Sequence, residues 1–335
     1  MPAKRRVDVV GAVLSALGMG GVVLGILVWQ EGGEFVGLLI AVGLVALGSL
    51  VWWLRRRKQE RKPALLDIDL FASKYFRLGI SSQTLQQIAL GGLMIALPIY
   101  LQMVLEYNAL EAGLSLAPLS LSMFAVALFA GRKLGHRSPS KIILAGFVLL
   151  GIGIAVLIPF VPRVHSGWAL VAPLIAAGCG LGLLVSQLNN YTLSPIEEER
   201  VSEAAGVNSA GGSFGLSFGL AFAGAIMLAS LSLLFTHYSD QSTVLSPAEK
   251  DHVASQLEDN AEVMSNTHLE ALLEGQPADV KAEILHINTV ARPKSLQIAL
   301  LIPLLAAALG VFSGFRMTRL PDPEPSSAAE SVLAG

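Results

Sequence analysis

Eight stretches of this chain contain no Asp, Glu, Lys or Arg, and each has about the 20 residues that a helix needs to cross the hydrocarbon of a bilayer. All 23 basic and 25 acidic side chains lie outside them. Backbone polar groups in hydrocarbon must be paired within their own segment, so the stretches predict helices rather than isolated strands. This pattern excludes a soluble globule, a nucleic-acid-binding protein and a disulfide-stapled secreted domain. The windows are 9–29, 36–54, 82–105, 113–131, 142–161, 168–190, 209–236 and 296–315.

The sequence therefore predicts an all-α polytopic membrane protein with eight transmembrane helices, and the distribution of positive charge predicts their direction. If the amino terminus is cytoplasmic, the cytoplasmic segments hold 18 of the 23 Lys and Arg residues. Cytoplasmic loops of membrane proteins carry such an excess. We therefore expect both termini to be cytoplasmic and the long acidic segment 237–295 to be extracytoplasmic. A gate or partner site and a solvated lid without chemistry both remain open for that segment.

Four patterns of the capping-box type predict helix starts. The pattern at Asn108 would start the fourth membrane helix, and the one at Ser194 a short acidic cytoplasmic helix. Two more, at Ser246 and Thr267, fall within 237–295 and predict two or three short surface helices there.

Small and polar residues within the windows are the candidates for packing and for binding. Gly211, Gly215 and Gly219 form a ladder of the kind that lets helix backbones approach closely. Buried amides and hydroxyls should face the bundle interior or a wet cavity, so a substrate-facing role and interhelical hydrogen bonding both remain open. These residues are Gln83, Gln86, Gln87, Gln102, Ser115, Ser120, Ser122, Ser186, Gln187, Asn189 and Asn190; for the last two, solvation at the cytoplasmic surface is the favoured interpretation.

Several kinds of site have no support in the sequence. No carboxylate lies within a window, and the nearest, Asp8, stands at the start of the first. The six histidines fall in loops without ligand spacing, so no metal site is indicated. No Walker-type glycine loop and no nucleophile–base pair is present, and Cys179 is alone. We expect no cofactor and no enzymatic activity.

Four motifs in sequence order carry a family resemblance. Residues 5–11 are RRVDVVG, residues 63–71 are PALLDIDLF, residues 97–102 are LPIYLQ, and residues 107–114 are YNALEAGL, followed by Pro118. In this order they resemble the carboxy-terminal part of a major facilitator superfamily transporter of the fourteen-helix drug:proton antiporter type. The six helices that precede this region in that family are not in the sequence, which leaves open a misplaced start, a partner chain or a remnant.

The resemblance implies a division of the chain. Residues 1–62 would be two linker-type transmembrane helices and 63–81 a cytoplasmic connecting segment. Residues 82–315 would be a six-helix transporter lobe built as a 3+3 inverted repeat, interrupted by the extracytoplasmic loop 237–295, and 316–335 a disordered cytoplasmic tail. The third, fourth, sixth and seventh helices would line the substrate cavity. The cavity candidates are Gln86, Gln87, Gln102, Ser120 and Gln187.

The loop at 131–141 corresponds in the resemblance to a gating loop of the form G-x-x-x-D-x-x-G-x-[RK]. Gly135 stands in place of the Asp and Ser138 in place of the second Gly, while the basic content is retained. The candidate gating residues are Gly131, Arg132, Lys133, Arg137 and Lys141.

The resemblance implies secondary active transport, in which an amphipathic or drug-like solute leaves the cell by proton antiport with alternating access. The expected partners are the bilayer of the cell membrane, a small-molecule substrate, protons and a second lobe or chain, but no nucleic acid. The alternative is a non-transporting subunit, regulator or truncated remnant that packs against a complete transporter through the glycine ladder.

Overall fold

The computed structural model describes residues 8–30, 35–60, 66–134, 137–161, 163, 166–246 and 266–323, and every regular element in them is a helix. Eight helices are long and apolar enough to cross a membrane, which confirms the predicted polytopic all-α fold. They are α1 (Val9–Gln30), α2 (Val36–Gln59), α3 (Lys74–Ile99), α4 (Ala109–Lys133), α5 (Pro139–Phe160), α6 (Val171–Leu193), α7 (Glu198–Gln241) and α10 (Ala278–Met317). The short elements are η1 (Ile68–Ala72), the π-helical turn η2 (Tyr100–Val104), η3 (Gly167–Leu170) and α9 (Asn266–Leu272).

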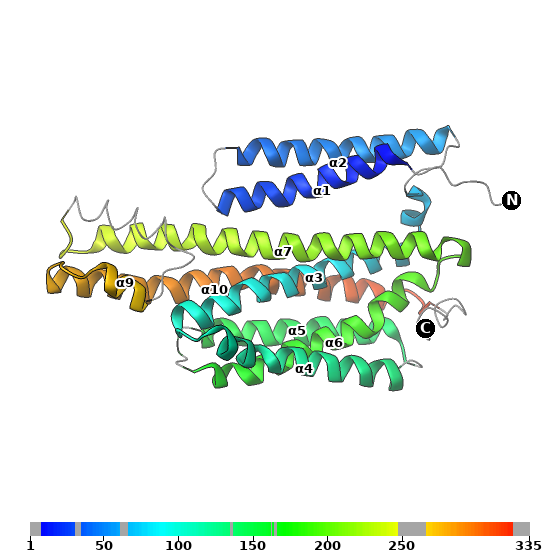
Figure 1. Ribbon diagram of the computed structural model, residues 1–335. Helices are drawn as coiled ribbons and strands as arrows, with labels where there is room; N and C mark the ends of the chain where they lie inside the picture. Colours follow the sequence, from blue (N-terminus) through cyan, green and yellow to red (C-terminus); the bar gives the residue numbers. More distant parts are fainter. Residues whose placement is uncertain are drawn as a thin grey trace.

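Helices α1 and α2 form a hairpin that lies along the outer side of α7 (Figure 1). The two helices touch backbone to backbone, because a Cβ atom on Gly43 would lie 2.6 Å from the amide nitrogen of Val22. At the open end of the hairpin, the buried Asp8 carboxylate accepts hydrogen bonds from Trp53 Nε1 at 3.1 Å and from Arg57 Nη2 at 3.1 Å. This carboxylate at the start of α1 also suits the positive end of the helix dipole.

The other six spanning helices form one bundle whose contacts repeat in pairs. Helix α3 packs on α7 as α4 packs on α6, and α3 packs on α10 as α6 packs on α5. Exchanging α3 with α6, α4 with α7 and α5 with α10 therefore maps these contacts onto one another, which is the relation expected of a 3+3 inverted repeat. The α7–α10 contact is the exception, since the described parts of α4 and α5 have no contact of similar extent.

The glycine ladder lies at the α3–α7 crossing. A Cβ atom on Gly215 would lie 2.6 Å from the carbonyl oxygen of Thr84, and one on Gly219 would lie 2.4 Å from that of Ile88. At Gly211 the nearest neighbour is a side-chain atom, Ile80 Cγ1, at 3.2 Å. Gly215 and Gly219 are thus in close contact with the backbone of α3, whereas Gly211 faces a side chain of α3 that can move.

Helices α7 and α10 are much longer than their apolar windows. With 44 and 40 residues, they extend about 66 and 60 Å at about 1.5 Å per residue, roughly twice the hydrocarbon thickness of about 30 Å. Figure 1 shows α7 and α10 running side by side past the ends of the other helices, with α9 next to their projecting part. The expected loop 237–295 is therefore largely helical in its described parts, because α7 continues to Gln241 and α10 already begins at Ala278.

The capping patterns have different outcomes. Asn108 forms the predicted capping box with Glu111 at the start of α4. The prediction at Ser194 is wrong, since this hydroxyl donates to Asn190 Oδ1 and α7 begins at Glu198 as a single helix rather than a short separate one. Residues 247–249 of the third pattern lie outside the described residues. At the fourth, α9 begins one residue before Thr267.

The first turn of α9 is held by a side chain from a distant part of the chain. Glu106, which has a positive φ of 55°, accepts from Thr267 N at 2.7 Å and from Thr267 Oγ1 at 2.6 Å. Leu269 is buried beneath α9 against Val280 and Ile284 of α10. The connection between α3 and α4 is thereby joined to the projecting end of α7 and α10.

We expect Glu106→Ala to release α9, because both donors of Thr267 lose their acceptor. The free energy of local opening of residues 266–272 should fall by roughly 1–2 kcal/mol, the usual worth of a helix cap. Hydrogen exchange of this segment measures the effect. Glu274→Ala, at an exposed acid beyond α9, is the control and should leave exchange unchanged. Equal exchange in the two variants would show that α9 is held by its contacts with α10, such as the packing of Leu269, and not by Glu106.

Candidate transport site

A stripe of partly exposed residues runs along α3 and continues into η2. Its members recur at intervals of three or four residues, so they share one face of the helix. The Oε1 atom of Gln87 is buried and has no hydrogen-bond partner in the described part of the chain. The amide of Gln102 donates to the carbonyl of Pro98 at 3.4 Å. The stripe consists of Gln83, Gln87, Leu90, Met94, Pro98 and Gln102.

Two of the other cavity candidates are buried among packed helices. Gln86 is 1% exposed and Gln187 is 4% exposed. Gln86 precedes Gln87 by one residue and therefore points about 100° away from it around the helix. Its Oε1 atom also has no hydrogen-bond partner among the described residues. These positions favour roles within the lobe for both side chains.

The remaining cavity candidate, Ser120, is exposed on α4. No hydrogen bond joins any two of the five predicted cavity residues within the ranges that the structure describes. Only Gln87 and Gln102 lie on the α3 stripe, so the structure does not gather the five into one cluster. Contact of any of them with a substrate remains a prediction.

A hydrogen-bonded amide pair connects α6 and α7, and of its two members only Asn189 was a candidate from the sequence. Asn208 Nδ2 donates to Asn189 Oδ1 at 2.7 Å, and Asn208 is 4% exposed. Asn189 is exposed, in line with its expected solvation, and Asn208 lies one residue before an apolar window. The position of Asn208 at the margin of that window was the only available signal. This hydrogen bond links α6 to α7, two helices that otherwise make few contacts with each other.

Arg292 is a buried cation that the sequence placed in an exposed loop. It is 5% exposed in α10, and its Nε donates to Asn288 Oδ1 at 2.7 Å. The Nη2 atom has no hydrogen-bond partner among the described residues. A cation that is buried without an ion-pair partner is costly, because nothing in the protein offsets the hydration that it loses.

Arg292 lines a small cavity beside the π-helical turn η2. The cavity has a volume of about 20 Å³, room for roughly one water molecule, and Tyr100, Met103 and Leu231 also line it. A π-helical turn within a helix is often found at a functional site. Here the π-helical turn follows α3 and lies beside the Arg292 guanidinium, whose Nη2 has no hydrogen-bond partner among the described residues.

The candidate gating loop connects α4 to α5. Gly131, Arg132 and Lys133 lie in the last turn of α4, and Arg137 and Lys141 flank the start of α5. All five are exposed, and Lys133 lies over the ring of Phe129 at 5.5 Å. Of the two departures from the gating-loop pattern, Gly135 lies outside the described residues, and Ser138 directly precedes α5 with its hydroxyl 3.0 Å from that of Ser140. A role in gating remains a prediction.

Comparison with known proteins gives a consistent set of relatives. The sequence profile described as Major Facilitator Superfamily matches residues 1–220. A "Probable actinorhodin transporter" of Streptomyces coelicolor is 25% identical over 239 residues, covering 69% of this chain and 41% of the relative. The "Lincomycin resistance protein LmrB" of Listeria innocua is 29% identical over 200 residues, covering 57% of this chain and 41% of the relative. The "Multidrug resistance protein B homolog" of Mycobacterium tuberculosis is 27% identical over 186 residues, covering 56% and 33%.

Proposed function

The chain belongs to the major facilitator superfamily, and from this premise we propose that it is the carboxy-terminal part of a secondary transporter that exports amphipathic or drug-like solutes by proton antiport. The observation that carries the proposal is the α3 stripe, where amides lie at both ends, Leu90 and Met94 lie between them, and no charge is present. Such a surface suits a largely apolar solute with a few polar groups. The names of the relatives, which refer to antibiotics and drugs, support the same substrate class.

Transport by this chain would require a second lobe. The chain spans about two fifths or less of the length of the curated relatives it matches. None of the eight apolar windows contains an Asp or Glu, so we place the proton-carrying acid on that second lobe. Helices α1 and α2 would then be the linker pair, and α3 to α10 the carboxy-terminal lobe. The assignment includes cytoplasmic termini, a cell-membrane location and no enzymatic activity.

We include Arg292 in the site as a buried cation. Its free Nη2 would donate to an acceptor that arrives during transport, on the solute or on the other lobe. The α3 stripe and Arg292 therefore have separate roles, the first in contacting the apolar body of the solute and the second in recognising a polar group.

The alternative of a passive subunit has less support. It required the glycine ladder as a docking surface for another transporter. Gly215 and Gly219 are already in contact with Thr84 and Ile88 of α3, so this part of the ladder is occupied within the chain.

The proposal is tested by dye efflux from cells that lack their own drug exporters. We expect this chain, co-expressed with the six amino-terminal helices of a matching relative, to expel a fluorescent amphipathic dye until a protonophore is added. Gln87→Ala should slow efflux about fivefold, the worth of one hydrogen bond of about 1 kcal/mol to the solute. Thr236→Ala, at an exposed hydroxyl at the far end of α7, is the matched control.

Two results would contradict the proposal. Absence of efflux when both halves are inserted would exclude transport, and protonophore-resistant efflux would exclude proton antiport. Efflux by this chain alone would instead show that no second lobe is needed.

A further inference from the structure

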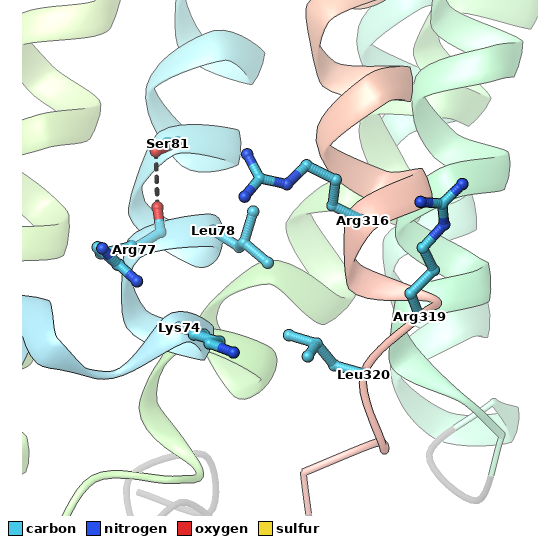
Figure 2. Close-up of a pocket in the computed structure, with 7 residues that line it drawn as sticks. All are labelled: Lys74, Arg77, Leu78, Ser81, Arg316, Arg319 and Leu320. Carbon is cyan, nitrogen blue, oxygen red and sulfur yellow. Dashed lines mark hydrogen bonds between the residues drawn. The ribbon is translucent and has the colours of Figure 1, made fainter.

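A basic hollow lies between the first turns of α3 and the end of α10, at the end of the bundle that the charge pattern assigns to the cytoplasm. Its volume is about 440 Å³, many times the roughly 30 Å³ of one water molecule. Figure 2 shows Arg316 reaching from α10 towards α3, with Leu78 and Leu320 in the space between the helices. The lining residues are Lys74, Arg77, Leu78, Ser81, Arg316, Arg319 and Leu320.

The four cations of this hollow are not neutralised by the described protein. All four are exposed, and none forms an ion pair with a carboxylate in the described ranges. The acid that follows on the chain, Asp322, accepts a hydrogen bond from Ser140 of α5 at 2.7 Å. A concentration of like charge in one hollow is unfavourable unless an anion joins it.

The start of α3 adds to this positive potential. Lys74 and Arg77 lie in or next to its first turn, which contains no acidic residue. The amino-terminal end of a helix already carries a partial positive charge, so cations there oppose the helix dipole. Arg316, in the last turn of α10, is favourably placed for its own helix. Lys74 and Arg77 therefore do not stabilise α3 through its dipole. An anion bound in the hollow would offset their unfavourable charge.

The apolar surface next to the cations distinguishes a lipid from a soluble anion. Phe312 and Phe315 lie one turn before Arg316 and Arg319 and are 64% and 53% exposed. The guanidinium of Arg319 lies 5.7 Å from the centre of the Phe315 ring. Positive charge at the end of α10, followed by exposed aromatic rings towards the membrane, matches the order of headgroup and acyl chain in a phospholipid.

We propose that this hollow binds the phosphate headgroup of an anionic phospholipid, with its acyl chains along the exposed phenylalanines of α10. Basic pockets between transmembrane helices on the cytoplasmic side are suited to such headgroups. The single negative charge of the lipid phosphate would offset part of the positive charge of Lys74, Arg77, Arg316 and Arg319 and so link α3 to α10. The site is independent of the solute that the transporter carries.

The test measures lipid binding to the purified full chain by native mass spectrometry. We expect phosphatidylglycerol to be retained at concentrations at which phosphatidylcholine is not. Arg77→Gln/Arg316→Gln should weaken phosphatidylglycerol binding roughly 30-fold, since each cation near the headgroup contributes about a fivefold effect. Arg77→Lys/Arg316→Lys should largely preserve binding, because the charge remains.

The control is Arg55→Gln/Arg132→Gln, which makes the same change of charge at two exposed arginines elsewhere on the same end of the bundle. Equal loss in both Gln pairs would show diffuse surface attraction and overturn the proposal. So would equal retention of the two lipids, or displacement of phosphatidylglycerol by glycerol 3-phosphate at a similar concentration, which would indicate a soluble anion. Elution of each variant as a single monodisperse peak verifies that it is folded.

Discussion

Gly219→Ala is expected to lower the free energy of unfolding by about 3 kcal/mol, the upper part of the range for overpacking a core. The added methyl would lie 2.4 Å from the carbonyl oxygen of Ile88 and 2.8 Å from its Cα. Both atoms belong to the backbone, so no side-chain rotation can relieve the overlap, and α3 and α7 must separate. Separation would also disturb the buried residues beside the crossing, since α3 packs on α10 and α6 as well.

The other glycines of α7 provide a graded series. Gly215→Ala meets the carbonyl oxygen of Thr84 at 2.6 Å and should have an effect similar to that of Gly219→Ala, whereas Gly211→Ala meets only a side-chain atom and should have a smaller one. Gly206 has no atom within 4 Å, so Gly206→Ala should be neutral or stabilising by up to about 1 kcal/mol, the gain in helix propensity. Thermal unfolding in detergent ranks the four variants. Equal effects at positions 206 and 219 would mean that the α3–α7 crossing is not closely packed.

The membrane helices could be predicted because hydrocarbon excludes charge along a whole segment. Each charge-free window is therefore helical apart from the last residue of two of them, Leu105 and Val161, although the ends of α7 and α10 could not be placed. Outside the hydrocarbon, charged residues are compatible with helix, and the length of α10 depends on its contact with α7. Ser194 and Asn108 have the same pattern, but only Asn108 has the extended backbone that a cap requires, with ψ of 167°. Ser194 has ψ of −38° and ends the preceding helix.

The site was less predictable, because the direction of a side chain depends on which helix covers it. Gln86 and Gln87 are adjacent and chemically identical, but only Gln87 belongs to the partly exposed stripe. The burial of Arg292 arises from η2 and α7, which are distant in sequence. A search of the sequence for charges within apolar windows could not find it, since the window begins at residue 296.

Arg292→Met is expected to slow dye efflux at least tenfold while changing the free energy of unfolding by only about 1 kcal/mol. Replacing a buried ion by an apolar residue of similar volume is often neutral or stabilising, by up to about 4 kcal/mol. Against this gain, Asn288 Oδ1 loses the donor that lies 2.7 Å away, at a cost of about 1–3 kcal/mol. The two effects oppose each other in stability, but only the loss of Nη2 would affect the acceptor that we propose to arrive during transport.

The matched control for Arg292→Met is Lys281→Met on the same helix, where the cation forms a 3.5 Å ion pair with Glu270. This partly exposed pair is worth less than about 1 kcal/mol, so both efflux and stability should be nearly unchanged. Efflux is measured with both halves co-expressed, and stability by thermal unfolding of the purified chain. Normal efflux together with a large fall in the unfolding temperature of Arg292→Met would assign the guanidinium to packing rather than transport. Arg292→Lys separates the effect of charge from that of geometry. A lysine keeps the charge, but it lacks the planar guanidinium that donates to Asn288 through Nε while Nη2 stays available. Partial efflux in this variant would indicate that charge is the main requirement.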